Sequence, residues 1–167
     1  DMSAFDRPTG ERFAGGDRPG PELAAVVARL GGMSTLLKGV SMRQRNAVLR
    51  KYMDELFADQ VLDVRLLPAD CGGVPGEWVL APGADPQRRL LYIHGGAFML
   101  GSPRSHRSIT TRLAKLAQCE VLAIHYRRVP EHPFPAQIED AVTGYKHQLK
   151  QGYKALRAGQ ETGDRAP

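Results

Sequence analysis

The residues best suited to chemistry lie near the middle of the chain, where residues 92–98 read Tyr-Ile-His-Gly-Gly-Ala-Phe. A pair of glycines lets the backbone adopt positive φ and lets backbone amides approach a ligand with no Cβ in the way. Successive amides that point at one position can bind a developing negative charge, such as the oxyanion formed during ester hydrolysis. The same glycines also suit an ordinary turn, so the neighbouring segments must decide between the two interpretations.

Histidines and cysteines offer two alternative kinds of site. Four histidines invite a metal-site interpretation or, for the first of them, a role as general base: His94, His106, His125 and His132. Their spacing matches no common zinc arrangement, so we expect no metal. Cys71 and Cys119 form no Cys-x-x-Cys pair, which indicates two inert small residues rather than a disulfide or zinc site. No cofactor is expected.

Local patterns predict the elements that position the glycines. The apolar run at residues 90–93 predicts a strand that closes into the glycine turn, and residues 120–124 predict a second buried strand. A helix is predicted to start at Ser102 as N-cap with Pro103 in its first turn. Its predicted apolar face comprises Ile109, Leu113, Leu116 and Ala117. A further helix is predicted at residues 138–149, with Ile138, Val142, Tyr145 and Leu149 in line.

Upstream of these elements, residues 63–67 and 77–80 predict an antiparallel strand pair. Two helices are predicted before it, one from Pro21 that stops at Gly31 and Gly32, and one at residues 42–58. These helices suit either a cap over another part of the protein or ordinary packing of their apolar faces. The order predicts an α/β fold: N-terminal helices, then an antiparallel strand pair leading into a mainly parallel sheet with flanking helices. Ligands bind beyond the carboxyl ends of such strands, which is where the glycines lie.

Composition indicates one globular unit and excludes several functions. The 167 residues are 42% hydrophobic and 25% charged, as in globular proteins. The net charge of +5 comes from scattered basic residues interleaved with acids, so no nucleic-acid partner is expected. No apolar run approaches the roughly 20 residues that span a bilayer, and no signal-peptide core is present. We therefore expect no membrane span and a cytoplasmic location. We divide the chain into a flexible arm (1–20), cap-like helices (21–58), a core (59–150) and a tail (151–167).

Three segments occur in order: residues 94–98, residues 126–136 (Tyr-Arg-Arg-Val-Pro-Glu-His-Pro-Phe-Pro-Ala) and Asp140. Together they resemble the hormone-sensitive-lipase-like branch of the α/β-hydrolases, a family of esterases and lipases, over residues 61–149. The resemblance implies an incomplete α/β-hydrolase fold, its N-terminal half. It also implies a small acyl ester as substrate and a serine nucleophile activated by histidine and an acid.

The resemblance assigns roles to named residues. The amides of Gly96 and Ala97 would be donors of the oxyanion hole, with Gly95 shaping the turn. The family often has a third glycine where this chain has Ala97. The remaining motif residues would be scaffold: His94, Phe98, Tyr126, Pro130, Glu131, Pro133, Phe134, Pro135 and Asp140. His94 would hold the loop rather than act as the catalytic base.

The chain departs from the family in having no Gly-x-Ser-x-Gly nucleophile elbow, and none of the Ser/acid/His triad is expected. Residues 163–167 fall near its expected place but carry Arg165 instead of serine. We interpret residues 151–167 as a degraded copy or an out-of-frame tail, and the chain as a truncated, inactive form. The alternative is a noncatalytic module that pairs with a related hydrolase. The strands at 90–93 and 120–124 would lack neighbours, which favours self-association through the open sheet edge.

Overall fold

The computed structural model describes residues 20–56 and 58–163. The chain divides into two compact units, Asp1–Lys38 and Gly39–Pro167. The first contains one described helix, α2 (Pro21–Leu36), with proline in its first turn. The prediction that this helix stops at Gly31 and Gly32 is wrong, because neither glycine takes the left-handed conformation that commonly ends a helix. Among the described residues, the first glycine with a left-handed φ is Gly39, at 75°.

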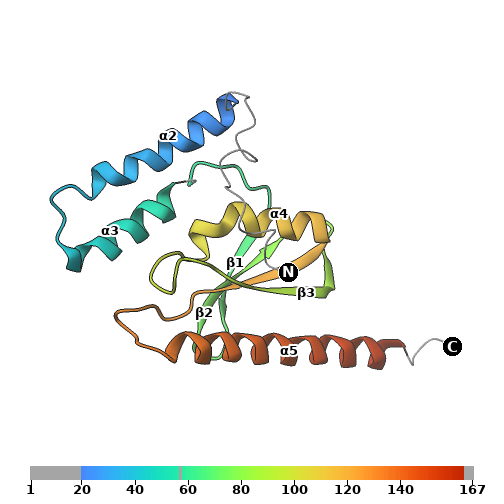
Figure 1. Cartoon of the computed structure of the whole chain (residues 1–167). Helices are drawn as coiled ribbons and strands as arrows, with labels where there is room; N and C mark the ends of the chain where they lie inside the picture. The colour runs from blue at the N-terminus through green and yellow to red at the C-terminus, as the bar shows by residue number, and fades with distance from the viewer. Residues whose placement is uncertain (1–19, 57, 164–167) are drawn as a thin grey trace, which may run out of the picture. The chain divides into compact units, whose positions relative to one another are not determined.

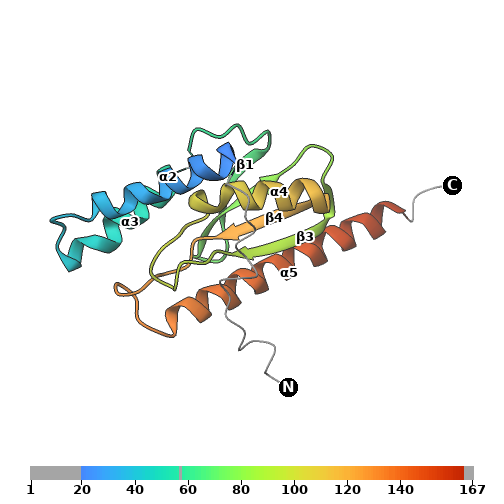
Figure 2. The same ribbon diagram turned by 45° about the horizontal axis from the view of Figure 1, so that its top comes forward.

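The second unit is built on a four-stranded mixed sheet (Figures 1 and 2). Its strands are β1 (Arg65–Asp70), β2 (Pro75–Leu80), β3 (Asp85–Ile93) and β4 (Cys119–Ile124), in the order β1-β2-β4-β3. β1 and β2 form the predicted antiparallel pair, and β3 runs parallel to β4. The α/β class is confirmed.

The expectation that both later strands lack neighbours is wrong for β4. The strand β4 lies inside the sheet, antiparallel to β2 on one side and parallel to β3 on the other. The hairpin therefore inserts beside β4, and within the described residues only β3 and β1 have an unpaired edge. Since β4 is buried on both faces, its residues 121–124 form a continuous apolar run.

The helices α4 (Arg107–Ala117) and α5 (Ala136–Gly163) cover opposite faces of the sheet (Figures 1 and 2). The core accordingly has two parts. Leu122 and Ile124 of β4 pack with Leu91 and Ala141 on the α5 side. The other part, on the α4 side, comprises Val79, Ala81, Ala114, Cys119 and Val121, with Leu113 packed against it. Both cysteines are buried and free, and burial raises the pKa of the Cys71 thiol.

The predicted apolar face of α4 is partly wrong. The buried residues are Thr110, Thr111 and Ala114, whereas Ile109 is 46% and Leu116 86% exposed. The small side chains of these buried residues let α4 lie close to the sheet. A prediction based on large apolar residues therefore does not find the buried face of this helix. The helix also begins later than predicted, after the 3-10 turn η1 (Arg104–His106). The Ser102 hydroxyl accepts the Ser105 amide of this turn at 3.1 Å.

Helix α5 extends well beyond the predicted residues 138–149. It continues through Gly163, so residues 151–163 are helical, and residues 164–167 lie outside the described part of the chain. The interpretation of residues 151–167 as a degraded or out-of-frame tail stays a prediction. The predicted in-line residues form one stripe on α5, and each is 43–54% exposed: Ile138, Val142, Tyr145 and Leu149. No helix in the described residues has the length and hydropathy needed to cross a membrane.

A partly buried ion pair joins β2 to the start of α4. The Arg107 guanidinium donates to both carboxylate oxygens of Glu77, at 3.0 and 2.6 Å, and only 11% of the Glu77 side chain is exposed. We expect Arg107→Met to lower the free energy of unfolding by about 2–3 kcal/mol, because Glu77 stays buried without its counter-charge.

Urea denaturation followed by circular dichroism measures this loss. The matched control is Arg112→Met on the exposed side of α4, expected to cost less than about 0.5 kcal/mol. The double variant Glu77→Gln/Arg107→Met should recover part of the loss. Equal losses for Arg107→Met and Arg112→Met would contradict the assignment.

Candidate functional site

Two loops lie side by side at one edge of the sheet because β3 and β4 are parallel and end in register, with Ile93 opposite Ile124. The first loop comprises residues 94–101 and the second residues 125–135. The Tyr126 hydroxyl donates to the His94 carbonyl at 2.9 Å, and the Val129 amide donates to the Phe98 carbonyl at 3.0 Å. The sheet thus brings the two sequence motifs into direct contact.

The first loop, here called the glycine loop (residues 94–101), has an unusual backbone. Gly96, Ala97 and Phe98 have φ of 124°, 53° and 59°. The amides of Met99 and Leu100 both donate to the Gly96 carbonyl, at 3.0 and 2.8 Å, which closes a tight turn. Within the described residues, the amides of Gly95, Gly96 and Ala97 donate to no acceptor. Successive unpaired amides in such a turn form an anion-binding concavity.

Steric crowding restricts two positions of the glycine loop to glycine. A Cβ on Gly96 would lie 2.5 Å from the Leu100 carbonyl carbon and closer still to its oxygen. A Cβ on Gly101, whose φ is 80°, would lie 2.7 Å from His94 Nδ1. A Cβ on Gly95, by contrast, would meet nothing within 4 Å. Gly101 was not among the predicted site residues, although its position at the end of the motif marks the same turn.

His94 lies buried beneath the loop, with 3% of its surface exposed, and stacks on the Tyr126 ring at 4.2 Å between centroids. Its Nδ1 lies 2.9 Å from the Gly95 carbonyl, so that nitrogen carries the proton. Its Nε2 is buried with no hydrogen-bond partner among the described residues. Burial, together with the nearby positive charges of His106, His125 and Arg128, lowers the pKa of His94 to about 4, against the opposing effect of its hydrogen bond to the Gly95 carbonyl. The neutral ring suits support of the loop, because neither nitrogen is open to a substrate proton.

Acidic motif residues hold the second loop through arginines. Asp140, on α5, accepts the Arg127 amide at 2.7 Å and the Arg127 guanidinium at 2.7–3.1 Å. Burial raises the pKa of Asp140, but these bonds outweigh it and the pKa lies below its usual value. Glu131 binds Arg50 of α3 (Met42–Glu55), and this contact lowers the pKa of Glu131 to about 2.

The remaining predicted scaffold residues lie on the surface of these loops. Phe98 is 55% and Phe134 78% exposed. Val129-Pro130 and Phe134-Pro135 are cis peptide bonds, and Pro133 accepts the Ala136 amide at the start of α5. Their predicted scaffold role, like the oxyanion-hole role of Gly96 and Ala97, stays a prediction.

Three of the four histidines considered as metal candidates lie at or beside the glycine loop. The rings of His106 and His125 lie 5.5 and 6.3 Å from that of His94, between centroids. His132 is exposed on the second loop. No group of three or more His, Cys, Asp or Glu side chains in the described part of the chain is arranged to hold a metal. The absence of a metal therefore remains an expectation from the sequence.

The sequence analysis did not identify two arginines that contact the glycine loop. Arg50 donates to the Met99 carbonyl at 2.7 Å, and Arg128 donates to the Gly101 carbonyl. Arg128 stood within the second motif, but nothing distinguished it from Arg127. Arg50 appears in the sequence only as one of several basic residues on a predicted helix, and no local pattern marks it.

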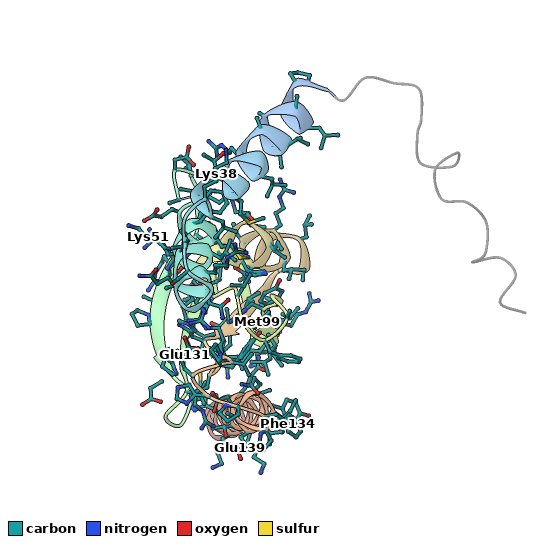
Figure 3. The ribbon with its side chains drawn as sticks, turned by 60° about the vertical axis from the view of Figure 1, so that its left-hand side comes forward. Lys38, Lys51, Met99, Glu131, Phe134 and Glu139 are labelled. Carbon is teal, nitrogen blue, oxygen red and sulfur yellow. The ribbon has the colours of Figure 1, made fainter. Side chains whose placement is uncertain are left out.

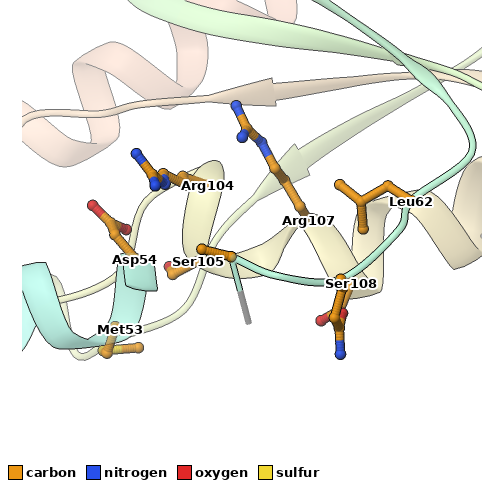
Figure 4. Close-up of a pocket in the computed structure, with 9 residues that line it drawn as sticks. Met53, Asp54, Leu62, Arg104, Ser105, Arg107 and Ser108 are labelled. Carbon is orange, nitrogen blue, oxygen red and sulfur yellow. The ribbon is translucent and has the colours of Figure 1, made fainter. Parts of the chain in front are cut away.

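A small cavity lies between α3 and the start of α4, and Figure 4 shows its lining. Its volume is about 60 Å³, and Met53, Asp54, Leu62 and Arg104 contribute to its walls. Small-molecule sites usually measure about 300–1,000 Å³. None of the predicted site residues lines the cavity, so it is not the candidate site.

The family model of the alpha/beta hydrolase fold matches residues 90–163. Over 81 residues the chain is 52% identical to an acetyl-hydrolase of Streptomyces hygroscopicus, covering 48% of this chain and 27% of that protein. Over 108 residues it is 38% identical to an esterase of Acinetobacter venetianus, covering 64% of this chain and 35% of that protein.

Solved structures show the same relation. An esterase from the bacterial hormone-sensitive lipase family superposes with a TM-score of 0.71 and 34% identity, covering 82% of this chain and 45% of that one. EstE5 soaked with p-nitrophenyl butyrate superposes with a TM-score of 0.62 and 32% identity, covering 80% and 45%. The chain therefore spans about a quarter to a third of the two curated relatives and less than half of the solved ones.

Proposed function

We propose that this chain, an α/β-hydrolase of the esterase family that includes the bacterial hormone-sensitive lipases, matched over part of the fold, supplies the oxyanion hole of a carboxylic-ester hydrolase. The three unpaired amides of Gly95, Gly96 and Ala97 at the carboxyl end of β3 carry this proposal. Gly96 and Ala97 are the donors, and Gly95 shapes the turn. Small acyl esters are the substrates.

The proposed chemistry needs a nucleophile in addition to these amides. A serine hydroxyl attacks the acyl carbon of the ester, the carbonyl electron pair moves onto oxygen, and the resulting oxyanion accepts hydrogen bonds from the loop. The histidine takes the serine proton during the attack and gives it to the leaving alcohol as the intermediate collapses, and water then hydrolyses the acyl-serine to release the acid. Residues 1–167 contain no Gly-x-Ser-x-Gly motif. We therefore propose that these residues by themselves are inactive and that the serine, histidine and acid come from outside them.

The predicted result for the 167-residue chain is no turnover of p-nitrophenyl butyrate and no labelling by a fluorophosphonate, since no serine in it is activated as a nucleophile. Residues 1–150 grafted onto the C-terminal half of a similar esterase should restore turnover. Serine labelling together with turnover that a Ser-to-Ala substitution abolishes would refute the inactivity of the chain. A folded graft without turnover would refute the oxyanion-hole function.

The second candidate is a noncatalytic module that pairs with a related hydrolase or with its own copy. The unpaired edge of β3 and the exposed stripe of α5 favour it, because Ile93 at the end of β3 is also 48% exposed. Co-expression with a similar esterase followed by size exclusion separates the candidates, since two independent peaks would count against pairing. A cytoplasmic location stays a prediction in both cases.

A further inference from the structure

One side chain of α3 contacts both loops of the candidate site. The Arg50 Nε donates to the Met99 carbonyl of the glycine loop at 2.7 Å, and its Nη2 donates to the Val129 carbonyl of the second loop at 2.9 Å. Its two Nη groups also bind the two carboxylate oxygens of Glu131, at 2.7 and 2.9 Å. Figure 3 labels Met99 and Glu131 next to α3. A single guanidinium therefore joins a helix to two loops.

The glycine loop needs such external support. Ala97, Phe98 and Met99 are exposed, and the first two hold positive φ, which costs about 1 kcal/mol or more for a residue with a side chain. Among the described residues, the groups outside the glycine loop that donate hydrogen bonds to its carbonyls include the Tyr126 hydroxyl, the Val129 amide and the guanidinium groups of Arg50 and Arg128. Hydrogen bonds from a charged donor are stronger than neutral ones, so Arg50 contributes a large part of that support.

Helix α3 also forms a hydrogen bond directly after the glycine loop, at Ser102. Asp54, one turn after Arg50 on α3, accepts a hydrogen bond from the Ser102 hydroxyl. Arg50 contacts Met99, three residues before Ser102. Positions four apart on a helix share one face, so α3 presents a cation and an anion to the two ends of this short segment.

We propose that Arg50 is a positioning residue of the esterase: its hydrogen bonds to the Met99 and Val129 carbonyls hold the amides of Gly96 and Ala97 in the orientation that binds the oxyanion. The inference rests on the proposed function. Arg50 touches no substrate and acts through the backbone three residues from Gly96. Displacement of such donors by about 1 Å can cost about a hundredfold in rate.

A purely structural ion pair between α3 and Glu131 is the competing explanation. The variant Arg50→Lys separates the two, because lysine keeps the positive charge beside Glu131 but lacks the planar fork that reaches both carbonyls. The variant Glu131→Gln removes the ion pair and keeps the fork. Lys51→Gln, on the exposed side of the same helix, is the matched control.

Hydrogen exchange in the 167-residue chain tests whether Arg50 orders the loops. The amides of Leu100 and Val129 report the turn and the contact between the loops, and those of Val121 and Leu122 report the sheet. We expect Arg50→Lys to speed exchange at Leu100 and Val129 by about tenfold or more with the sheet unchanged. Glu131→Gln should have a smaller effect, and Lys51→Gln none. Unchanged exchange at Leu100 and Val129 in Arg50→Lys would overturn the proposal.

Turnover in the graft tests the catalytic consequence. Arg50→Lys should lower kcat by about 10–100-fold and change KM by no more than about twofold. The amides of Gly96 and Ala97 lose their orientation toward the oxyanion, whereas the substrate still binds. Arg50 borders an open hollow of about 320 Å³, so added methylguanidinium should enter Arg50→Ala and restore part of the kcat. An active parent graft with unchanged kcat in Arg50→Lys would overturn this inference alone. A folded parent graft without turnover would overturn the proposed function and this inference with it.

Discussion

Replacing Gly96 with alanine in the grafted esterase is expected to lower kcat by about a hundredfold or more, the usual cost of losing one oxyanion donor. At Gly96 the backbone has φ of 124°, and a Cβ would collide with the Leu100 carbonyl. The hydrogen bonds from the Met99 and Leu100 amides to the Gly96 carbonyl close the turn, and this turn must therefore open. Its opening rotates the amides of Gly96 and Ala97 away from the oxyanion. The sheet lies outside this turn, so the melting temperature should fall far less than the rate.

The matched control is Gly95→Ala, since a Cβ at that position meets nothing within 4 Å. It should keep kcat within a few fold. Michaelis kinetics with p-nitrophenyl butyrate and thermal melts of both variants make the comparison. A folded Gly96→Ala graft with normal turnover would exclude Gly96 from the oxyanion hole. Equal losses of kcat in the two variants would indicate that the loop needs flexible glycines at both positions, rather than a Gly96 amide oriented toward the oxyanion.

Acidification below pH 6.5 is expected to destabilise the folded chain through His94. The pKa of this buried ring is about 4, whereas the ordinary value is 6.5. Between these values the unfolded chain binds a proton that the folded chain does not, so stability falls as the pH falls. The full shift corresponds to a loss of about 3 kcal/mol, complete below about pH 4. Burial also lowers the pKa of His125, which acts in the same direction.

Urea denaturation at pH values from 7.5 to 4 measures this loss. The pKa values of Glu131 and Asp140 lie below their ordinary values of 4.5 and 3.8, so the stability that these carboxylates contribute is lost only below about pH 4.5, and most of the His94 window lies above that pH. His94→Asn keeps an N–H donor for the Gly95 carbonyl and does not titrate. It should flatten the dependence between pH 6.5 and 4, although its stability at pH 7.5 is lower. A parent chain with constant stability across this window would show that His94 titrates normally.

Local sequence patterns were sufficient to predict most elements and the site loop. The mainly apolar runs at 90–93 and 120–124, bounded by turn residues, predicted the strands, and the glycine motif after the first predicted the turn that follows it. The structure confirms the antiparallel hairpin and the parallel pair of β3 and β4. Errors occurred where an element's end or buried face depends on packing, as in α2 beyond Gly31 and in α4 at Thr110.

By itself, the sequence determined which residues follow each strand, and therefore that the loops after β3 and β4 would meet if the strands were parallel. Only the tertiary structure decided that β4 lies between β2 and β3, that His94 is buried beneath the loop, and that Arg50 reaches Met99 and Glu131. Arg50 and Glu131 lie 81 positions apart. Such a contact depends on how the strands and helices pack in the tertiary structure. The residues next to Arg50 in the sequence form no pattern that predicts it.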